Sequence, residues 1–132
     1  MRSIADEGVH TKEECISTVK YITDALYVLN GKWKLPLIFT IKERPKRFNE
    51  ILKSMEGITP KVLAKELRDL EENEFLVRKV FPTTPVTILY ETTAYSDTLN
   101  NVLHELQQWG KQHREKIKQS IRDGKPGTSK HL

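Results

Sequence analysis

Residues 48–90 read FNEILKSMEGITPKVLAKELRDLEENEFLVRKVFPTTPVTILY, and this stretch decides the fold. Near its middle, Thr59 and Pro60 supply a capping hydroxyl and a residue suited to the first position of a helix. Gly57, just before them, permits a sharp turn. From about residue 59 to 72, leucines and cations each recur at helical spacing, which predicts a helix with one buried and one cationic face. The leucines are Leu63, Leu67 and Leu70, and the cations are Lys61, Lys65 and Arg68.

A shorter helix is expected before the turn, with an apolar stripe that consists of Phe48, Ile51, Leu52 and Met55. Only three residues join its end to Thr59, as a helix-turn-helix requires. Residues 75–81 and 86–90 are rich in aromatic and β-branched side chains and predict two strands. The two prolines between them cannot donate to a sheet, so residues 82–85 predict the loop of a hairpin, and its extended tip, about residues 82–87, is the candidate wing. This order is that of a winged helix-turn-helix, which points to DNA.

Further helices are expected on both sides of this motif. Thr11 and Glu14 form a capping-box pattern, and an apolar stripe then continues to Asn30. Residues 33–42 predict an apolar helix, in which Pro36 is tolerated only in the first turn. Apolar residues keep helical spacing from 99 to 121, farther than a small core can cover. We therefore expect the terminal helices to form a homodimer through Val19, Ile22, Leu26, Leu106, Trp109, His113 and Ile117.

The chain of 132 residues is long enough for one domain of ordinary burial. The expected fold class is α+β and mostly α, a winged helix-turn-helix with N- and C-terminal dimerisation helices over residues 13–122. Residues 1–12 are expected to be a disordered segment, and residues 123–132 a flexible basic tail. No stretch reads as a membrane span or a signal peptide, so a cytoplasmic protein is expected.

Positive charge is concentrated in the motif and the tail. Residues 32–79 carry 12 basic and 8 acidic side chains, and residues 111–132 carry 7 and 2. Residues 1–31 and 80–110 are net acidic. This distribution favours a polyanionic partner. The histidines and the single cysteine show neither metal-ligand spacing nor a catalytic arrangement, so we expect no enzyme, no metal and no cofactor.

Several spaced motifs resemble the HxlR family of bacterial winged-helix transcription regulators, a relative of the MarR type. The resemblance runs from about residue 19 to 110. The matching pieces are Asn30-Gly31-Lys32-Trp33-Lys34-Leu35, Lys46-Arg47-Phe48-Asn49-Glu50-Ile51, Gly57-Ile58-Thr59, Leu63, Leu67-Arg68-Asp69-Leu70-Glu71, Leu76-Val77-Arg78-Lys79, Pro82, Pro85 and Tyr90. The resemblance implies that residues 59–68 form the recognition helix, that residues 83–87 form the wing, and that the terminal helices form the dimer interface.

The sequence departs from the family pattern at two positions, and each departure leads to a prediction. The family usually has glycine where Glu74 stands, so Asn73 is expected to take the left-handed capping conformation instead. Some members of the family sense oxidants or electrophiles through a cysteine at the position that Lys20 occupies here. Cys15 lies elsewhere and falls on the apolar stripe of the first helix, which favours a packed structural cysteine over a redox sensor.

The cationic helix is expected to lie in the major groove of double-stranded DNA, with Lys61, Lys65 and Arg68 reading bases. Phosphate contacts are expected from Thr59, Lys46, Arg47, Asn49, Thr83, Thr84 and Thr87. Two alternatives stay open: a winged-helix module that binds protein, and a regulator that senses redox state through Cys15. The sequence marks no small-molecule effector and no membrane partner.

Overall fold

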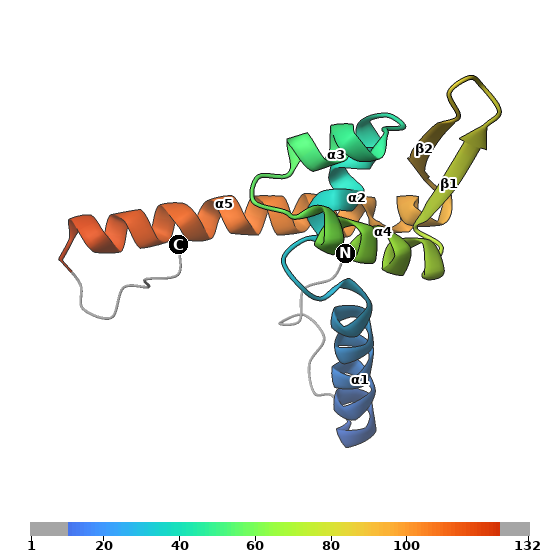
Figure 1. Ribbon diagram of the computed structural model, residues 1–132. Coiled ribbons are helices and arrows are strands. Elements are labelled where there is room, and N and C mark those ends of the chain that lie inside the picture. The colour runs from blue at the N-terminus through green and yellow to red at the C-terminus, as the bar shows by residue number, and fades with distance from the viewer. Residues whose placement is uncertain (1–10, 125–132) are drawn as a thin grey trace.

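The computed structural model describes residues 11–124 and confirms a mostly helical winged helix-turn-helix (Figure 1). The expectations for residues 1–10 and 125–132 lie outside the described residues. In chain order the elements are α1 Lys12–Leu29, α2 Lys34–Glu43, α3 Phe48–Ser54, α4 Pro60–Glu72, β1 Leu76–Phe81, β2 Thr87–Thr92, the 3₁₀ helix η2 Tyr95–Leu99 and α5 Asn100–Arg122.

The core lies between α2, α3, α4 and the start of the hairpin. Pro36 falls in the first turn of α2, the one place where that helix tolerates it. The leucines of α4 are all buried, as their spacing predicts, and the stripe of α3 is buried or half-buried. The buried apolar residues are Leu37, Ile38, Ile41, Ile51, Met55, Ile58, Leu63, Leu67, Leu70, Phe75, Leu76 and Leu99.

The predicted helix starts are confirmed by hydrogen bonds. The Thr11 hydroxyl accepts from the Glu14 N–H at 3.1 Å, and the Glu14 carboxylate accepts from the Thr11 N–H at 3.0 Å, which forms the capping box. The Thr59 hydroxyl accepts from the Val62 N–H at 3.2 Å and caps α4. Gly57 has a φ of 88° in the turn between α3 and α4, a conformation that glycine adopts without strain.

The end of α4 differs from the sequence expectation. Asn73 has a φ of −90°, and Glu74 takes the left-handed conformation with a φ of 67°. The Phe75 N–H donates to the Leu70 carbonyl at 2.9 Å and the Glu74 N–H to the Glu71 carbonyl at 3.0 Å. These two bonds define a Schellman motif, whose left-handed position is one residue later than we expected.

We expect Glu74→Gly to raise the free energy of unfolding by about 1 kcal/mol, because glycine removes the steric conflict of a β-carbon at positive φ. Urea denaturation at fixed protein concentration measures this change. The control is Glu72→Gly, which places glycine at the last residue of α4 and should destabilise by up to about 1 kcal/mol. Equal losses in both variants would show that position 74 carries no such strain.

A single β-bridge, which the sequence did not predict, joins the segment before α3 to the edge of the two-stranded hairpin. β1 and β2 are antiparallel, and Lys79 lies opposite Leu89. The segment just before α3 joins β2, where the Lys46 N–H donates to the Tyr90 carbonyl at 3.0 Å and the Tyr90 N–H donates to the Lys46 carbonyl at 2.8 Å. This pairing ties the helix-turn-helix to the hairpin.

The terminal helices leave the body of the protein. In Figure 1, α1 and the outer part of α5 extend away from the core in different directions. Neither helix contains a buried residue. Within residues 11–124, no helix is long and apolar enough to span a bilayer.

Candidate nucleic-acid interface

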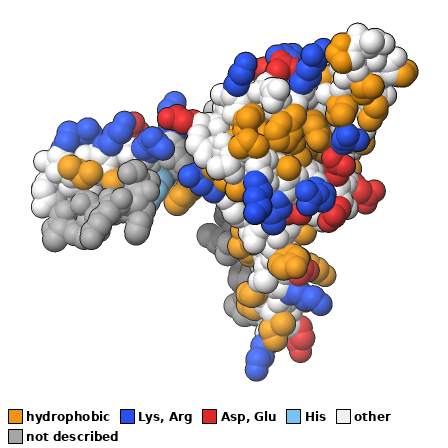
Figure 2. All heavy atoms as spheres, in the orientation of Figure 1, with side chains coloured by type: hydrophobic (Ala, Val, Ile, Leu, Met, Phe, Trp, Pro, Cys, Tyr) orange, Lys and Arg blue, Asp and Glu red, His pale blue; other side chains and the backbone are white. Residues whose placement is uncertain are grey.

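The exposed side of α4 carries three cations. Its inner side consists of Leu63, Glu66, Leu67 and Leu70, all buried, whereas Lys61, Lys65 and Arg68 are exposed. Because Thr59 and Pro60 start the helix, Lys61 stands in its first turn beside amides that have no partner within the helix. Figure 2 shows basic and acidic side chains together over this part of the surface. The helix therefore presents a basic face whose charge is locally opposed by carboxylates.

The three cations differ in their surroundings. The Lys65 ammonium lies 2.8 Å from Asp69 Oδ2 and 3.7 Å from Glu66 Oε1. The bond to Asp69 raises the pKa of Lys65, and the bond to Lys65 lowers the pKa of Asp69. Within residues 11–124, Lys61 and Arg68 form no ion pair.

Beneath this face lies a buried ion pair that the sequence analysis missed. Lys34 Nζ lies 2.9 Å from Glu66 Oε2 and 3.3 Å from Glu66 Oε1, and 3.4 Å from Asp69 Oδ2. The Lys34 and Glu66 side chains retain 8% and 11% of their accessible surface. The pair fastens the start of α2 to the inner side of α4. Each of these charged residues lies on the same face of its helix as buried apolar residues. This position in the sequence pattern could have indicated that the two side chains are buried.

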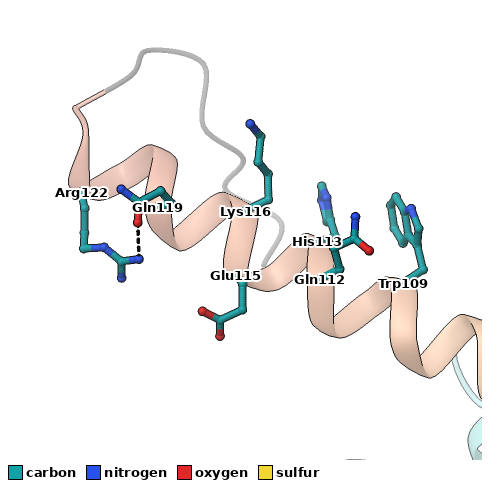
Figure 3. A pocket seen from close by; sticks show the side chains of 7 residues that line it. All are labelled: Trp109, Gln112, His113, Glu115, Lys116, Gln119 and Arg122. Atoms are coloured by element: carbon teal, nitrogen blue, oxygen red, sulfur yellow. Dashed lines mark hydrogen bonds between the residues drawn. The ribbon is translucent and has the colours of Figure 1, made fainter.

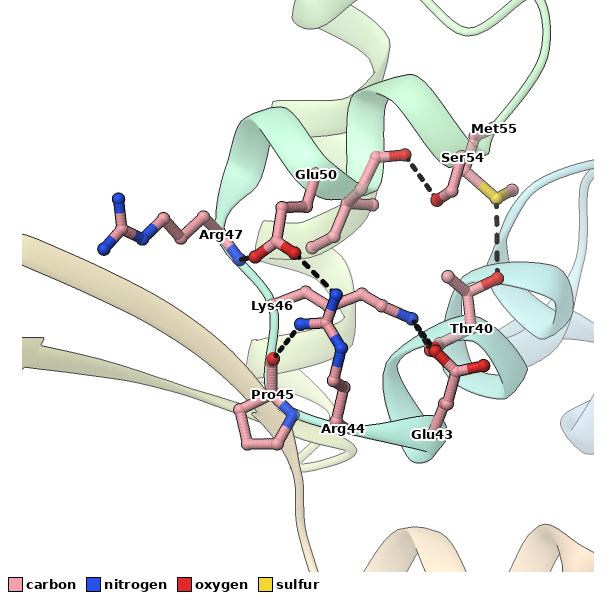
Figure 4. A network of polar contacts seen from close by, with 10 residues as sticks. Thr40, Glu43, Arg44, Pro45, Lys46, Arg47, Glu50, Ser54 and Met55 are labelled. Carbon is pink, nitrogen blue, oxygen red and sulfur yellow. Dashed lines mark hydrogen bonds and ion pairs between the residues drawn. The ribbon is translucent and has the colours of Figure 1, made fainter.

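Lys46 is wrongly predicted as a phosphate contact. Its side chain is buried, and its ammonium donates to the Thr40 carbonyl at 2.7 Å and to Glu43 Oε1 at 3.0 Å (Figure 4). The Lys46 ammonium lowers the pKa of Glu43. The ammonium of Lys46 thus has its hydrogen-bond partners inside the subunit, and the backbone of Lys46 pairs with β2. The role of Lys46 in the structure is therefore to support the hairpin.

Arg47 and Asn49 are exposed where α3 begins, as a role in phosphate contact requires. The Glu50 carboxylate orders this start, since it accepts from the Arg47 N–H at 3.0 Å and from Arg44 Nη2 at 2.7 Å (Figure 4). The hydrogen bond from Arg44, followed by that from the Arg47 N–H, lowers the pKa of Glu50. The Arg47 guanidinium forms no ion pair within residues 11–124.

The three threonines of the hairpin tip are near one another. The Thr83 hydroxyl lies 2.6 Å from the Pro85 carbonyl and 2.9 Å from the Thr87 hydroxyl, while Thr84 is exposed. The hydroxyls of Thr83 and Thr87 therefore already form hydrogen bonds within the tip. Residues 82–86 include no cation. The nearest cation on the strands is Lys79, and its ammonium is paired with the Glu91 carboxylate at 2.6 Å.

Five of the seven candidate dimer residues are exposed in the single subunit. On α1, Val19, Ile22 and Leu26 are 63%, 56% and 62% accessible. On α5 the exposed apolar residues are Val102, Leu106, Trp109 and Ile121, and His113 and Ile117 are half-buried. The Trp109 and His113 rings stack with centroids 4.8 Å apart on the outer part of α5 (Figure 3). These apolar stripes have no partner among the described residues.

Cys15 is exposed on α1, which corrects the expectation of a packed cysteine. Its position on the apolar stripe of α1 places it beside the candidate dimer residues rather than in the core. Across residues 11–124, no group of three or more metal-binding side chains comes together.

Comparison with known proteins gives a consistent result. Residues 28–118 match the family model described as HxlR-like helix-turn-helix. The chain is 38% identical over 88 residues to the HTH-type transcriptional regulator YodB of Bacillus subtilis, covering 67% of this chain and 79% of YodB. It is 36% identical over 86 residues to an uncharacterized HTH-type transcriptional regulator of Halalkalibacterium halodurans, covering 64% of this chain and 76% of the relative. These relatives are transcriptional regulators, not enzymes.

Solved structures of a redox regulator and of a transcriptional regulator share the fold. The redox regulator HypR in its reduced form superimposes with a TM-score of 0.69 at 30% identity, covering 74% of this chain and 97% of HypR. The reduced form of YodB from Bacillus subtilis gives a TM-score of 0.64 at 36% identity, covering 70% of this chain and 90% of that chain.

Proposed function

Since this chain belongs to the HxlR-like helix-turn-helix family and is a transcriptional regulator, we propose that it binds double-stranded DNA sequence-specifically as a homodimer. In this proposal α4 enters the major groove, and the hairpin tip lies on the phosphate backbone. The observation that carries the proposal is the face of α4, where cations are exposed opposite a row of buried leucines. A helix held in this way on a rigid core can reach base edges without rearrangement.

The proposed contacts divide into two groups. Lys61, Arg68 and Lys65 read bases, since lysine and arginine donate to the acceptors of guanine in the major groove. The phosphate contacts, which fix position rather than sequence, come from Thr59, Arg47, Asn49, Thr83, Thr84 and Thr87. Because Thr59 caps α4, it contacts a phosphate together with the backbone amides of the first helical turn.

The terminal helices support a dimer. Leu26 on α1 and Leu106 on α5 belong to apolar stripes that one subunit leaves open to water. Large exposed apolar surfaces of this kind mark protein interfaces. A second copy provides matching stripes through two-fold symmetry, and the two α4 helices then lie about 34 Å apart in successive major grooves.

Selection of genomic DNA fragments by the purified full chain tests the proposal. We expect enrichment of a roughly palindromic site whose half-sites are about one helical turn apart. The affinity for that site should fall by on the order of a thousandfold between about 50 and about 200 mM salt, because several phosphates release counterions. Absence of any enriched sequence would contradict sequence-specific binding and favour a module that binds protein.

Redox control through Cys15 is a second candidate, favoured by the exposure of this thiol. YodB has been solved after diamide treatment and with bound quinone, and HypR in an oxidised form. With one cysteine in the sequence, a protein disulfide must join two copies. Diamide should then change the affinity of the unaltered protein for its selected site but not that of Cys15→Ser. An equal response of both proteins would remove this candidate.

A further inference from the structure

A row of cations follows the outer part of α5 on the side away from its apolar stripe. At 3.6 residues per turn, Lys111, Arg114, Lys118 and Arg122 lie within about 80° of one another around the helix axis and roughly opposite Trp109. All four cations are exposed. Figure 2 shows basic side chains along this part of α5. We call these four residues the α5 ridge.

The positive charge of this segment is almost unopposed within the subunit. Residues 111–122 carry five basic side chains and one acidic side chain, a net charge of +4 that equals the formal net charge of the whole chain. The one carboxylate, on Glu115, lies 3.7 Å from the Lys118 ammonium, which is too far for a hydrogen bond. Among the described residues, Lys111 and Arg114 have no ion pair.

Such a row of like charges is unfavourable for a helix by itself. Arg114 is three residues after Lys111, and Lys118 and Arg122 follow at intervals of four, so neighbouring cations on the helix surface repel one another. The α5 ridge lies opposite the apolar stripe, so the proposed dimer would leave it exposed. Figure 3 shows Arg122 pointing away from the side that carries the Trp109 ring. An anionic partner outside the subunit would remove this repulsion.

We propose that the α5 ridge is a second DNA-contacting surface, which binds the phosphate backbone of duplex DNA away from the bases that α4 reads. This inference rests on the proposed DNA-binding function. From Lys111 to Arg122 the helix rises about 16 Å, a length over which one strand of duplex DNA carries about five phosphates. Among the phosphate contacts proposed above, only Arg47 is a cation. The ridge therefore supplies most of the charge that holds the dimer on the backbone, without regard to sequence.

Lys111→Gln combined with Arg114→Gln is the informative variant, because it replaces two cations of the ridge with uncharged polar side chains. Its affinity is measured for the selected duplex and for a scrambled duplex, both long enough to extend a full helical turn beyond the half-sites. We expect both affinities to fall at least about tenfold at about 100 mM salt, so that their ratio stays the same. The slope of log affinity against log salt should become shallower by about 3 to 4, because the dimer loses four phosphate contacts.

Two controls separate contact from net charge. Lys12→Gln combined with Lys20→Gln removes the same charge from exposed positions of α1, and it should lower both affinities less than about threefold. Lys111→Arg combined with Arg114→Lys keeps the charge of the ridge and should bind both duplexes as the unaltered protein does. Sedimentation checks that each variant is still a dimer, and circular dichroism checks that it is folded.

The outcomes are distinct. Equal losses on both duplexes in the glutamine variant of the ridge, absent from both controls, support the inference. If the unaltered protein prefers its selected duplex but that variant loses affinity no more than the α1 control, or loses it for the selected duplex alone, the inference is overturned and the proposed function stands. If the unaltered protein binds both duplexes equally and the variant loses affinity for both, sequence-specific binding fails and the ridge stands. If the unaltered protein binds neither duplex, both fail.

Discussion

Lys34→Met is expected to lower the free energy of unfolding by about 3–5 kcal/mol, a large part of the stability of a domain of this size. The substitution removes the buried cation 2.9 Å from Glu66 Oε2 and leaves the buried carboxylate only the more distant Lys65 ammonium, which is mostly exposed and lies 3.7 Å from Glu66 Oε1. Methionine fills a similar volume, so the loss arises from the unpaired charge rather than from a cavity. Urea denaturation at neutral pH and fixed protein concentration measures the change.

Two further variants identify the cause. Lys53→Met makes the same change at an exposed position of α3 and should alter stability by less than about 0.5 kcal/mol. Adding Glu66→Met to Lys34→Met should recover most of the loss, since a buried ion pair can be replaced by apolar side chains with little penalty. A loss below about 1 kcal/mol in Lys34→Met would show that the pair does not secure α4 to the core.

Leu106→Glu is expected to weaken dimerisation by at least about 100-fold. In the proposed dimer, two-fold symmetry would place a carboxylate from each subunit in the apolar interface, and burying unpaired charges is costly. Because a monomer contacts only one half-site, affinity for the selected DNA should fall at least as much. Sedimentation over a range of concentrations measures the oligomeric state, and retention of a labelled duplex measures DNA binding.

The matched control adds the same charge two residues later. Gln108→Glu lies about half a turn from Leu106 and about a quarter of a turn from Trp109, the nearest residue of the apolar stripe, and should leave the dimer intact. Circular dichroism confirms that both variants keep their helices. If Leu106→Glu dimerises as tightly as Gln108→Glu, the α5 stripe is not the interface, and another surface must cover the apolar residues of α1.

Local sequence signals predicted the bounds and the buried face of α4 well. Thr59 and Pro60 fix its start, and the spacing of Leu63, Leu67 and Leu70 fixes its buried side, so its exposed side follows from helical geometry. These signals lie within one or two turns of one another. The same kind of local pattern located α3 and the hairpin.

The missed features depend on contacts between distant parts of the chain. Lys46 lies in a basic pair that looks exposed, but its backbone pairs with Tyr90 and its ammonium turns inward to α2. Lys34 and Glu66 are 32 residues apart, and no periodicity links them. A charged residue at a position of the apolar stripe can indicate a buried ion pair, and both Lys34 and Glu66 occupy such positions.

The end of α4 shows how one residue of register changes a prediction. Placing the left-handed position at Asn73 followed from residue preference alone, since asparagine tolerates this conformation better than glutamate. The hydrogen bond from the Phe75 N–H to the Leu70 carbonyl instead selects Glu74. Packing of Phe75 in the core therefore outweighs the preference of the intervening residue.

The sequence preference of the Lys61→Ala protein tests most directly whether the basic face of α4 reads DNA. The affinities of the unaltered and variant proteins are measured for the selected duplex and for each of its single-base-pair changes. We expect Lys61→Ala to lose about 1–3 kcal/mol of discrimination at one base pair per half-site, whereas Arg47→Ala should weaken all duplexes alike. A Lys61→Ala protein that keeps both its affinity and its preference at every base pair would contradict this account.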